Sequence, residues 1–435
     1  MLKTYLKQAW ELLKQNKLFS SLYIVGTGLS IAMTMVIAIV YYVRIAPVYP
    51  ETNREYTLVV KTAQMTKEKN MQAAMLSYAM LKEWMYTLKS AELVTGVYSP
   101  WGNNSSYIQQ SETEEEVPVQ VKYTDENFFG VFPLTFLDGK PFTEADRRSS
   151  IRNAVLTDSY ARQLFGTTQG VVGKVISLNY TDVKIVGIVR GGSYLTPDSY
   201  AQLYLPYSCM DGYDKKGRLW GIGAYRAYIL SKGKDGIADV KTEVDELVRK
   251  YNAAGGDDNW KIDLVGQPET YWRNTFRTFQ NQNIDWTKVI GTFAGIAFVL
   301  LFVPALNLSG MISARMERRL PEMGVRKAFG ANRGLLLKQV LWENLVLSGL
   351  GALLGLVVAW IALVISGHNT FSLFESYPSG VPEGADASLG MDMLFAPAVF
   401  VVAVLFCLLL NVLSALIPAW QSLRRPITAS LNEQK

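Results

Sequence analysis

The chain has 435 residues but only one histidine and two cysteines. His368 by itself cannot supply the clusters of histidine and cysteine that hold zinc in most proteins. Cys407 lies inside a long apolar run and Cys209 in the middle of the chain, so we do not expect a disulfide between them. The sequence also lacks a recognisable pairing of nucleophile and base. We therefore predict that the protein is not an enzyme, with no catalytic residue, cofactor or metal site of its own.

Charged residues are missing from four long stretches of the chain, and each stretch has at least 22 residues. A bilayer core about 30 Å thick needs about 20 helical residues, so each stretch is long enough to span it. Four such runs in one chain argue against helices buried in a soluble core. The first run is longer than the apolar part of a secretory signal and has no convincing cleavage site after it, so we expect an uncleaved anchor. The stretches are 22–43, 289–312, 345–366 and 393–423.

Lysine and arginine are also absent from the short connection at residues 367–392, which has four acidic residues. In contrast, residues 1–17 have four lysines against one glutamate, and residues 313–339 have seven basic against two acidic residues. Because short basic loops stay in the cytoplasm, both termini and segment 313–339 are predicted to be cytoplasmic. Segments 45–286 and 367–392 then lie outside. The net charge of +5 follows from this topology, so we expect no nucleic-acid partner.

These features predict an α-helical membrane protein with four transmembrane helices and a large α+β extracytoplasmic domain. Both ends of the external region have strand and helix patterns, which suggests one module with a β-rich module inserted into it. The predicted segments are a cytoplasmic amphipathic helix (1–17), TM1 (18–44), the external domain (45–286, with a first module at 45–100 and 222–286 and an inserted module at 101–221), TM2 (287–312), a cytoplasmic loop (313–339), TM3 (340–366), a short external loop (367–392), TM4 (393–420) and a cytoplasmic tail (421–435).

Within the external region, periodicity and propensity predict individual strands and helices. The first module is expected to have two strand–helix–strand units, one from each end of the region. The predicted elements are strands at 55–60, 92–98, 225–230 and 260–265, helices at 70–89 and 237–251, and, in the inserted module, strands at 117–122, 174–178 and 184–189 with a short helix at 157–165 that ends at Gly166.

The cytoplasmic loop has the residue order of a short, self-capped helix. Pro321 fits the first turn of the helix. A backbone N–H in that turn has no hydrogen-bond partner within the helix, so the missing N–H of proline costs nothing there. Glu322 complements the positive end of the helix, and Arg326 with Lys327 complements the negative end. Gly330 stands where a left-handed residue would end the helix. Such a helix could dock on a soluble motor through charge-assisted bonds, or it could rest on lipid headgroups.

The sequence EMGVRKAFGA at residues 322–331 resembles the E-I-G-x-R-K-A-x-G-A motif of MacB/FtsX-type ABC transporter permeases. Further similarities occur along essentially the whole chain. They include FFGVF at 128–132, DGKPF at 138–142, VGIV at 186–189, PALNLSG at 304–310, GLGALLG at 349–355 and PAW at 418–420.

The resemblance implies a mechanotransmission permease of the bacterial inner membrane with a porter-like external module. It also implies work as a dimer with a second copy or a paralogue, driven by a cytoplasmic ABC ATPase that binds ATP and Mg. A periplasmic membrane-fusion protein and an outer-membrane channel are further expected partners.

MacB itself has its ATPase at the N-terminus of the same chain, whereas this chain starts seventeen residues before its first span, so we expect a separate ATPase. Pro321 departs from the charged residue that is common in the family. The residues expected to couple to the ATPase are Glu317, Glu322, Met323, Gly324, Arg326, Lys327, Gly330 and Ala331.

Small residues recur four apart in two of the predicted spans. Gly291 with Gly295, and Gly351 with Gly355, allow close helix approach, either in a dimer or within the chain. Asn411, inside the last predicted span, is expected to form an interhelical hydrogen bond, as is Asn307 in the second. Glu343, at the cytoplasmic start of the third span, is expected to snorkel or to pair with a basic residue rather than to relay protons.

The function that these expectations favour is efflux of hydrophobic or peptide-like molecules. Lipoprotein release uses the same architecture and remains an alternative. Regulation of cell-wall hydrolases, as in FtsX, is another, although the external domain of FtsX is much smaller than the region at 45–286.

Overall fold

The computed structural model describes residues 17–99, 106–109, 116–215, 217, 219–318, 320–366, 369, 385–390, 393 and 396–424. The chain forms two compact units. We call the first the helical unit; it comprises Met1–Tyr42, Trp286–Gly367 and Met393–Lys435. The second, the sheet unit, comprises Val43–Asp285 and His368–Asp392.

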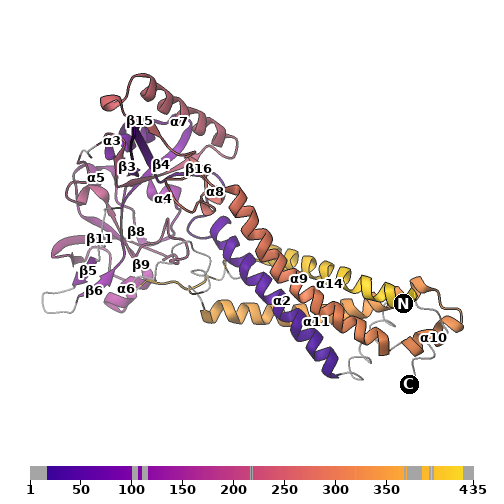
Figure 1. The fold of residues 1–435 in the computed structure, drawn as a ribbon. Coiled ribbons are helices and arrows are strands. Elements are labelled where there is room, and N and C mark those ends of the chain that lie inside the picture. The colour runs from indigo at the N-terminus through magenta and orange to yellow at the C-terminus, as the bar shows by residue number, and fades with distance from the viewer. Residues whose placement is uncertain are drawn as a thin grey trace. The chain divides into compact units, whose positions relative to one another are not determined.

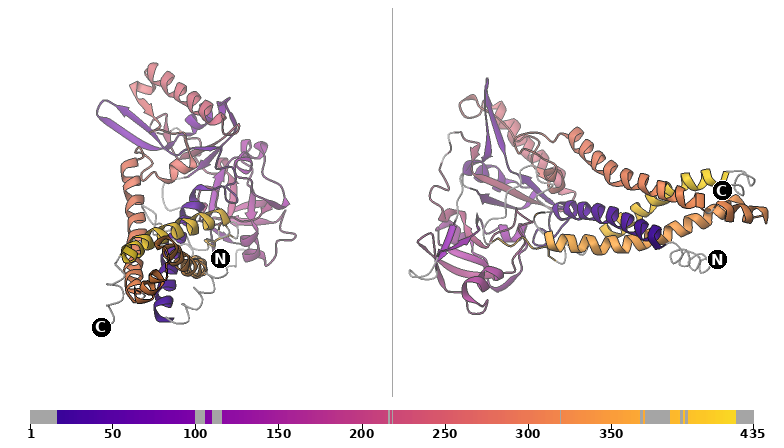
Figure 2. Two further views of the ribbon diagram at one scale, coloured as in Figure 1. Left: turned by 90° about the vertical axis from the view of Figure 1, so that its right-hand side faces the viewer. Right: turned by 60° about the horizontal axis from the view of Figure 1, so that its bottom comes forward.

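The helical unit is built from long helices and one short one (Figure 1). They are α2 (Lys17–Ile45, whose last residues belong to the sheet unit), α9 (Trp286–Arg318), α10 (Leu320–Ala328), α11 (Arg333–Ser366) and α14 (Pro397–Arg424). Helices α2 and α11 lie side by side along their apolar faces (Figure 2).

Three helices in the described part of the chain are long and apolar enough to cross a membrane. They cover Ser20–Ile45, Arg333–Ile365 and Pro397–Gln421, which match the first, third and fourth predicted spans. The second predicted span lies within α9, where several side chains are outside the described part. The total of four spans therefore stays a prediction. The predicted amphipathic helix at 1–17, the tail at 421–435 and the loop at 367–392 lie mostly outside the described residues.

The sheet unit is built around a 16-stranded sheet whose main path runs β15-β2-β3-β14-β4-β7-β12-β9-β11-β10-β5-β6. Most neighbours are antiparallel, but β11 pairs with β9 and β12 with β7 in parallel. The strands are β1 (Thr57–Val60), β2 (Ala63–Lys67), β3 (Asn70–Leu76), β4 (Ala91–Tyr98), β5 (Ser106–Gln109), β6 (Val117–Val119), β7 (Val121–Thr124), β8 (Phe136–Gly139), β9 (Asn153–Thr157), β10 (Val175–Leu178), β11 (Thr181–Val189), β12 (Leu203–Pro206), β13 (Ile222–Gly223), β14 (Tyr225–Ser231), β15 (Lys261–Asp263) and β16 (Glu269–Thr270).

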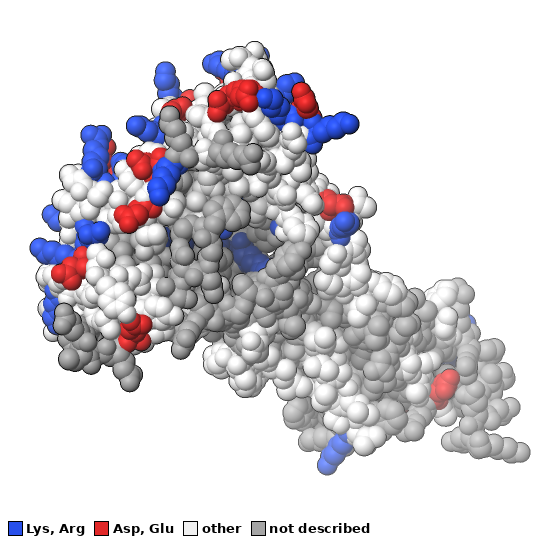
Figure 3. Space-filling model, turned by 60° about the vertical axis from the view of Figure 1, so that its left-hand side comes forward, with Lys and Arg blue, Asp and Glu red and all other residues white. Residues whose placement is uncertain are grey.

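Short helices cover this sheet and bury its apolar side chains. Val240 and Val244 of α7 pack into one core with Met80 of α3 and Tyr160 of α6, whereas Phe128 of α4 packs into a second. On the face shown in Figure 3, acidic and basic side chains are interspersed. The helices are α3 (Tyr78–Glu83), α4 (Phe128–Val131), α5 (Glu144–Arg148), α6 (Asp158–Phe165), α7 (Gly236–Ala253) and α8 (Tyr271–Thr275), with 3₁₀ turns η1 (Met85–Thr87), η2 (Tyr207–Cys209) and η3 (Asp257–Asn259).

The helix predicted at 70–89 is wrong over its first half. Residues Asn70–Leu76 form β3, which pairs with β2 as a hairpin from Ala63↔Ala74 to Lys67↔Asn70. Methionine, alanine and leucine favour helix locally, but the ladder to β2 overrides this preference. Only the second half is helical, as α3 and then η1.

Other predicted elements are confirmed. Strands β1, β4 and β14 lie where expected, and α7 covers the predicted helix at 237–251. Helix α6 ends at Gly166, whose φ of 72° provides the left-handed cap that the sequence predicts.

The strands of the two predicted external modules occupy different ends of the same sheet. Strands β1–β4 and β13–β16 come from 45–100 and 222–286, and β5–β12 come from 101–221. The two sets meet where β4 pairs with β7, at Tyr98↔Tyr123.

Candidate functional site

Helix α10 has the capping that its sequence predicts. Pro321 lies in its first turn, and Gly330 follows its end with φ of 90°. The N–H of Ala331 donates to the carbonyl of Arg326 at 2.9 Å, and that of Gly330 donates to the carbonyl of Lys327 at 3.0 Å. These bonds satisfy two of the last carbonyls of the helix, so the C-terminal end of α10 is capped.

A row of polar contacts joins α10 to α11. Glu322 accepts from Arg326 one turn later, at 2.6 Å. The other terminal nitrogen of Arg326 donates to Oε1 of Gln339 at 2.8 Å, and Gln339 donates to Glu343 at 3.1 Å. Gln339 and Glu343 are buried. These bonds join α10 to α11 through side chains as well as through the connecting turn.

The remaining predicted coupling residues lie in different surroundings. Gly324 is buried, whereas Glu317 and Gly330 are exposed, and the side chain of Met323 lies outside the described part. Helix α10 also exposes two apolar side chains one turn apart, Val325 and Phe329, the second of which is 87% exposed. The family motif does not single out this pair of residues. Their i, i+4 spacing on an amphipathic helix is the sequence signal that indicates a shared face.

The two predicted pairs of small residues differ in what surrounds them. A Cβ on Gly351 would come within 2.0 Å of Oγ1 of Thr27, and one on Gly355 within 2.5 Å of the carbonyl oxygen of Gly28. This pair therefore serves close packing of α11 on α2 within the chain. Gly291 and Gly295 have open space where a Cβ would stand.

Neutral hydrogen bonds connect three of the long helices. The hydroxyl of Tyr23 on α2 lies 3.0 Å from the hydroxyl of Ser348 on α11. The side-chain amide of Asn411 on α14 donates to the same hydroxyl at 3.4 Å. The prediction of an interhelical bond for Asn411 is confirmed. Glu343 accepts a hydrogen bond from the side-chain amide of Gln339 at 3.1 Å. The side chain of Asn307 lies outside the described part.

Two buried arginine–glutamate pairs hold the places where the chain enters and leaves the sheet unit. After α2, Nε of Arg54 donates to Glu51 at 2.7 Å, and Nη1 donates to the carbonyl oxygens of Val43 and Ala46. Glu51 in turn accepts from the N–H and the hydroxyl of Ser199, at 2.9 and 2.8 Å.

Before α9, Arg277 forms the second pair with Glu269, at 2.7 and 2.8 Å. Arg277 also donates to the carbonyl oxygens of Val265 and Gln282. The side chains of both partners are at most 2% exposed. Neither pair could be predicted from the sequence, because nothing in the residues near 51 or 269 indicates which carbonyl groups the fold will bring there.

The loop between β11 and β12 gathers several segments that are distant in sequence. Ser199 binds Glu51, and Asp198 binds Lys61 at 2.9 Å and the hydroxyl of Tyr228 at 2.7 Å. The hydroxyl of Tyr200 accepts from the N–H of Asp386, which belongs to the predicted loop at 367–392. One loop therefore contacts two of the chain's connections to the helical unit.

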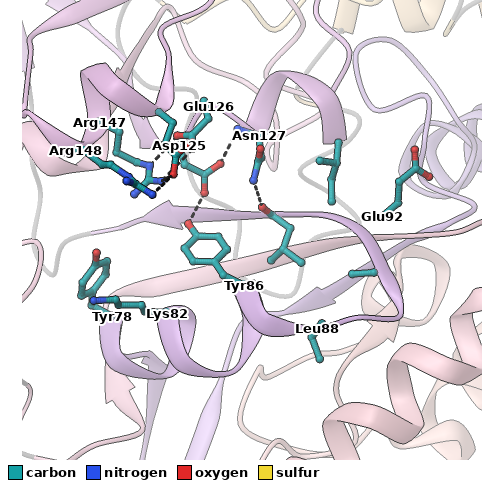
Figure 4. Close-up of a pocket in the computed structure, with 14 residues that line it drawn as sticks. Tyr78, Lys82, Tyr86, Leu88, Glu92, Asp125, Glu126, Asn127, Arg147 and Arg148 are labelled. Atoms are coloured by element: carbon teal, nitrogen blue, oxygen red, sulfur yellow. Dashed lines mark hydrogen bonds and ion pairs between the residues drawn. The ribbon is translucent and has the colours of Figure 1, made fainter.

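A cavity of about 560 Å³ opens between α3, η1, β4, the start of α4 and α5 (Figure 4). At its base, the carboxylate of Asp125 accepts from the hydroxyls of Tyr86 and Thr95 and from the N–H groups of Gly96 and Asn127. Burial disfavours the charged form and raises the pKa of Asp125 from 3.8 to about 6. Four donors hold this group, so it organises the cavity wall.

Charged side chains line the rim of the same cavity. Arg147 binds both carboxylate oxygens of Glu126, at 2.7 and 3.0 Å, and Arg148 binds Glu144 at 2.7 Å. Among the described residues no group of histidine, cysteine and acidic side chains is arranged to hold a metal ion.

Comparison with known proteins gives matches along most of the chain. A family model described as the MacB-like periplasmic core domain matches residues 22–247, and one described as the FtsX-like permease C-terminal matches residues 294–427. The uncharacterised ABC transporter permease YknZ of Bacillus subtilis is 23% identical over 333 residues, which are 76% of this chain and 74% of that protein. The macrolide export ATP-binding/permease protein MacB of Sodalis glossinidius is 25% identical over 259 residues. That match covers 58% of this chain and 36% of the MacB protein.

A solved structure gives a further match. The periplasmic region of MacB from Actinobacillus actinomycetemcomitans aligns with 18% identity and a TM-score of 0.33, over 47% of this chain and 89% of that one. The first family model alone matches more than half of the chain. The chain therefore belongs to the family of MacB-like and FtsX-like ABC transporter permeases.

Proposed function

We propose that this permease couples ATP hydrolysis by an ABC ATPase partner to a conformational change of its sheet unit, and thereby extrudes hydrophobic or peptide-like molecules. The observation that carries the proposal is the buried arginine–glutamate pair at each of two chain connections. Arg54 is bonded to the carbonyl oxygens of Val43 and Ala46 as well as to Glu51. A movement of α2 would therefore reach the sheet through fixed bonds.

Buried ion pairs of this kind gain little net stability over apolar packing, because desolvation offsets the attraction. They do fix geometry, since a guanidinium with several acceptors has one arrangement that satisfies them all. Such pairs suit a joint that must transmit force without bending. Arg277 with Glu269 supplies the same kind of joint before α9.

Helix α10 is the proposed input for that force. Its capped C-terminal end makes it a rigid contact element, and the row from Glu322 through Arg326 and Gln339 leads into α11. The exposed Val325 and Phe329 give it an apolar surface that a cleft on the ATPase could cover. The proposed coupling set comprises Glu317, Glu322, Met323, Gly324, Arg326, Lys327, Gly330 and Ala331.

The proposal also includes a location and an assembly. The permease lies in the bacterial inner membrane, with both termini and α10 in the cytoplasm and the sheet unit in the periplasm. It works with a second copy or a paralogue, for which Gly291 and Gly295 offer an unoccupied close-contact surface. ATP and Mg are bound by the ATPase, and a membrane-fusion protein with an outer-membrane channel receives the cargo.

The name of the MacB relative, macrolide export, supports efflux as the direction of transport. Because this chain covers 36% of that protein, the cargo is proposed on the family resemblance and not transferred from the name.

Charge reversal on α10 tests the coupling. E322K and R326E should each abolish co-purification of the ABC ATPase, identified by mass spectrometry, and its stimulation by the permease. K338E reverses an exposed charge on α11 outside the row and should leave both unchanged. E322K should keep the wild-type melting temperature in detergent, because the Glu322–Arg326 pair is exposed. R326E also removes the hydrogen bond to the buried Gln339, so its melting temperature should fall slightly while the variant stays folded. Full partner binding and stimulation in both variants would contradict the proposal.

A further inference from the structure

We infer that the cavity above Asp125 binds a short molecule with a carboxylate at one end, an amine at the other and an apolar middle, such as a short apolar peptide with free termini. The volume of about 560 Å³ lies within the range of small-molecule sites, roughly 300–1,000 Å³. That this ligand is cargo rests on the function proposed above, whereas the binding itself does not.

The two ends of the cavity carry opposite charge. Figure 4 shows Lys82, Arg147 and Arg148 at one end and Glu92 at the other. Glu126 already neutralises Arg147, and Arg148 is paired with an acidic neighbour on its own helix. Lys82 has no hydrogen bond or ion pair among the described residues, so its ammonium group can bind a ligand carboxylate without breaking an existing bond.

Glu92 supplies the matching negative charge at the opposite end. This carboxylate likewise has no hydrogen bond or ion pair within the described part of the chain, and the residue is exposed. An ammonium group placed beside Glu92 would therefore gain a partner without breaking an existing bond, and the same holds for a carboxylate beside Lys82.

Between the charged ends, an aliphatic strip lies beside the polar side chains of Tyr86 and Asn127. Leu88, Ala91, Leu93 and Val94 contribute aliphatic side chains, and Leu88 lies between Lys82 and Glu92 in Figure 4. Leu88 and Val94 are mostly buried already. Covering the rest of this strip would favour an apolar ligand by about 25 cal/mol for each Å² removed from water.

The walls are held before a ligand arrives. Ser77 caps α3 by accepting from the N–H of Met80 at 3.0 Å, and the hydroxyl of Tyr86 is bonded to Asp125. Asn127 donates to the carbonyl oxygen of Val94 at 3.0 Å, which ties the start of α4 to β4. A preformed site loses little entropy when it binds.

A simple anion fits the cavity less well than a zwitterion. Glu126 and Glu144 stand beside the two arginines and Asp125 lies at the base, so a phosphate there would meet three carboxylates as well as three cations. A single carboxylate near Lys82 avoids most of this repulsion.

Binding of trileucine to the full-length permease in detergent tests the inference, with affinity measured by calorimetry and by saturation-transfer NMR. Blocking the amine by acetylation, or the carboxylate by amidation, should each weaken binding by roughly tenfold. In E92Q the free peptide should bind roughly tenfold more weakly, and acetylation should have no further effect. In K82M the same should hold for amidation. K250M and E246Q remove an exposed Lys–Glu pair on α7 outside the cavity and should bind like the wild type.

The inference is overturned if trileucine does not bind, or if the doubly blocked peptide binds as well as the free one. It is also overturned if E92Q and K82M leave the response to blocking unchanged. ATPase stimulation by the E322K and R326E variants is measured separately. Binding that follows the expected pattern while those variants stay fully coupled would support the site and refute the proposed function.

Discussion

The contacts among α2, α11 and α14 of the helical unit and the chain connections of the sheet unit use different kinds of buried polar group. In the helical unit, neutral hydrogen bonds connect Tyr23 and Asn411 to Ser348 on three separate helices. In the sheet unit, charged pairs such as Arg54 with Glu51 are buried and bonded to the backbone. Removing one partner of a buried ion pair costs far more than removing one neutral bond between membrane helices.

This difference indicates which parts of the molecule can move at low energetic cost. Neutral bonds of modest strength allow long helices to shift against one another at small cost. A sheet held by buried charge pairs moves as a body instead, because no single pair can be released cheaply. If the permease works as proposed above, we therefore expect the conformational change to lie in rearrangement of the helices, with the sheet unit moving as one body.

The largest expected effect on stability comes from Arg54→Met. The substitution leaves Glu51 buried without its cation, which should lower the free energy of unfolding by about 3–5 kcal/mol. Thermal unfolding of the detergent-solubilised chain, followed by tryptophan fluorescence, measures this. Removing an exposed cation with K234M should leave the melting temperature unchanged. Equal stability of R54M and the wild type would break the comparison between the units.

A smaller, pH-dependent effect is expected from Asp125→Asn. The folded-state pKa of about 6 is raised above the ordinary value of 3.8, so the folded chain holds this proton more tightly than the unfolded chain. Its contribution to stability is fully present below about pH 4 and is lost as the pH rises through about 6. The loss is about 3 kcal/mol over the whole range, and about 2 kcal/mol between pH 4.5 and 7, and should be absent from D125N.

Melting temperatures of the wild type and D125N at pH 4.5 and 7 measure this difference. D258N alters an exposed carboxylate and should follow the wild-type pH dependence. If D125N shows the same pH dependence as the wild type, Asp125 is not protonated in the way its surroundings imply.

The smallest effect is expected in the helical unit, from Ser348→Ala. The substitution removes the shared partner of Tyr23 and Asn411, and such bonds in membrane helices contribute about 0.6 kcal/mol each. Unfolding in detergent should therefore show a loss of roughly 1 kcal/mol. S30A removes a hydroxyl that bonds only within its own helix and serves as the control. If S348A lowered the free energy of unfolding as much as R54M does, the proposed difference between the two units would be wrong.

The parts of this fold that could be predicted from the sequence depend on neighbouring residues. Helix α10 begins and ends as Pro321 and Gly330 indicate, because capping involves residues within one turn. The strand at Asn70–Leu76 could not be predicted in the same way. Its residues favour helix, and the hairpin with β2 decides otherwise through hydrogen bonds that a window on one segment does not contain.

The candidate sites also differ in whether neighbouring residues or distant segments form them. Glu322 and Arg326 were found from a local motif, and they bind one another four residues apart. The cavity above Asp125 was missed, because its lining comes from residues 78–94, 125–127 and 144–148, each unremarkable alone. No spacing rule joins them.

The sequence by itself determined three helices that are long and apolar enough to cross a membrane, the short helix α10 and the family, since each follows from composition or from contacts within a few residues. Tertiary structure decided which carbonyl groups Arg54 and Arg277 would hold, how Gly351 would pack on α2 and where Lys82 would stand opposite Glu92. The physical reason is the distance along the sequence between the residues that interact. Capping and hydropathy act along the chain, whereas burial of charge and the shape of a cavity depend on segments that only folding brings together.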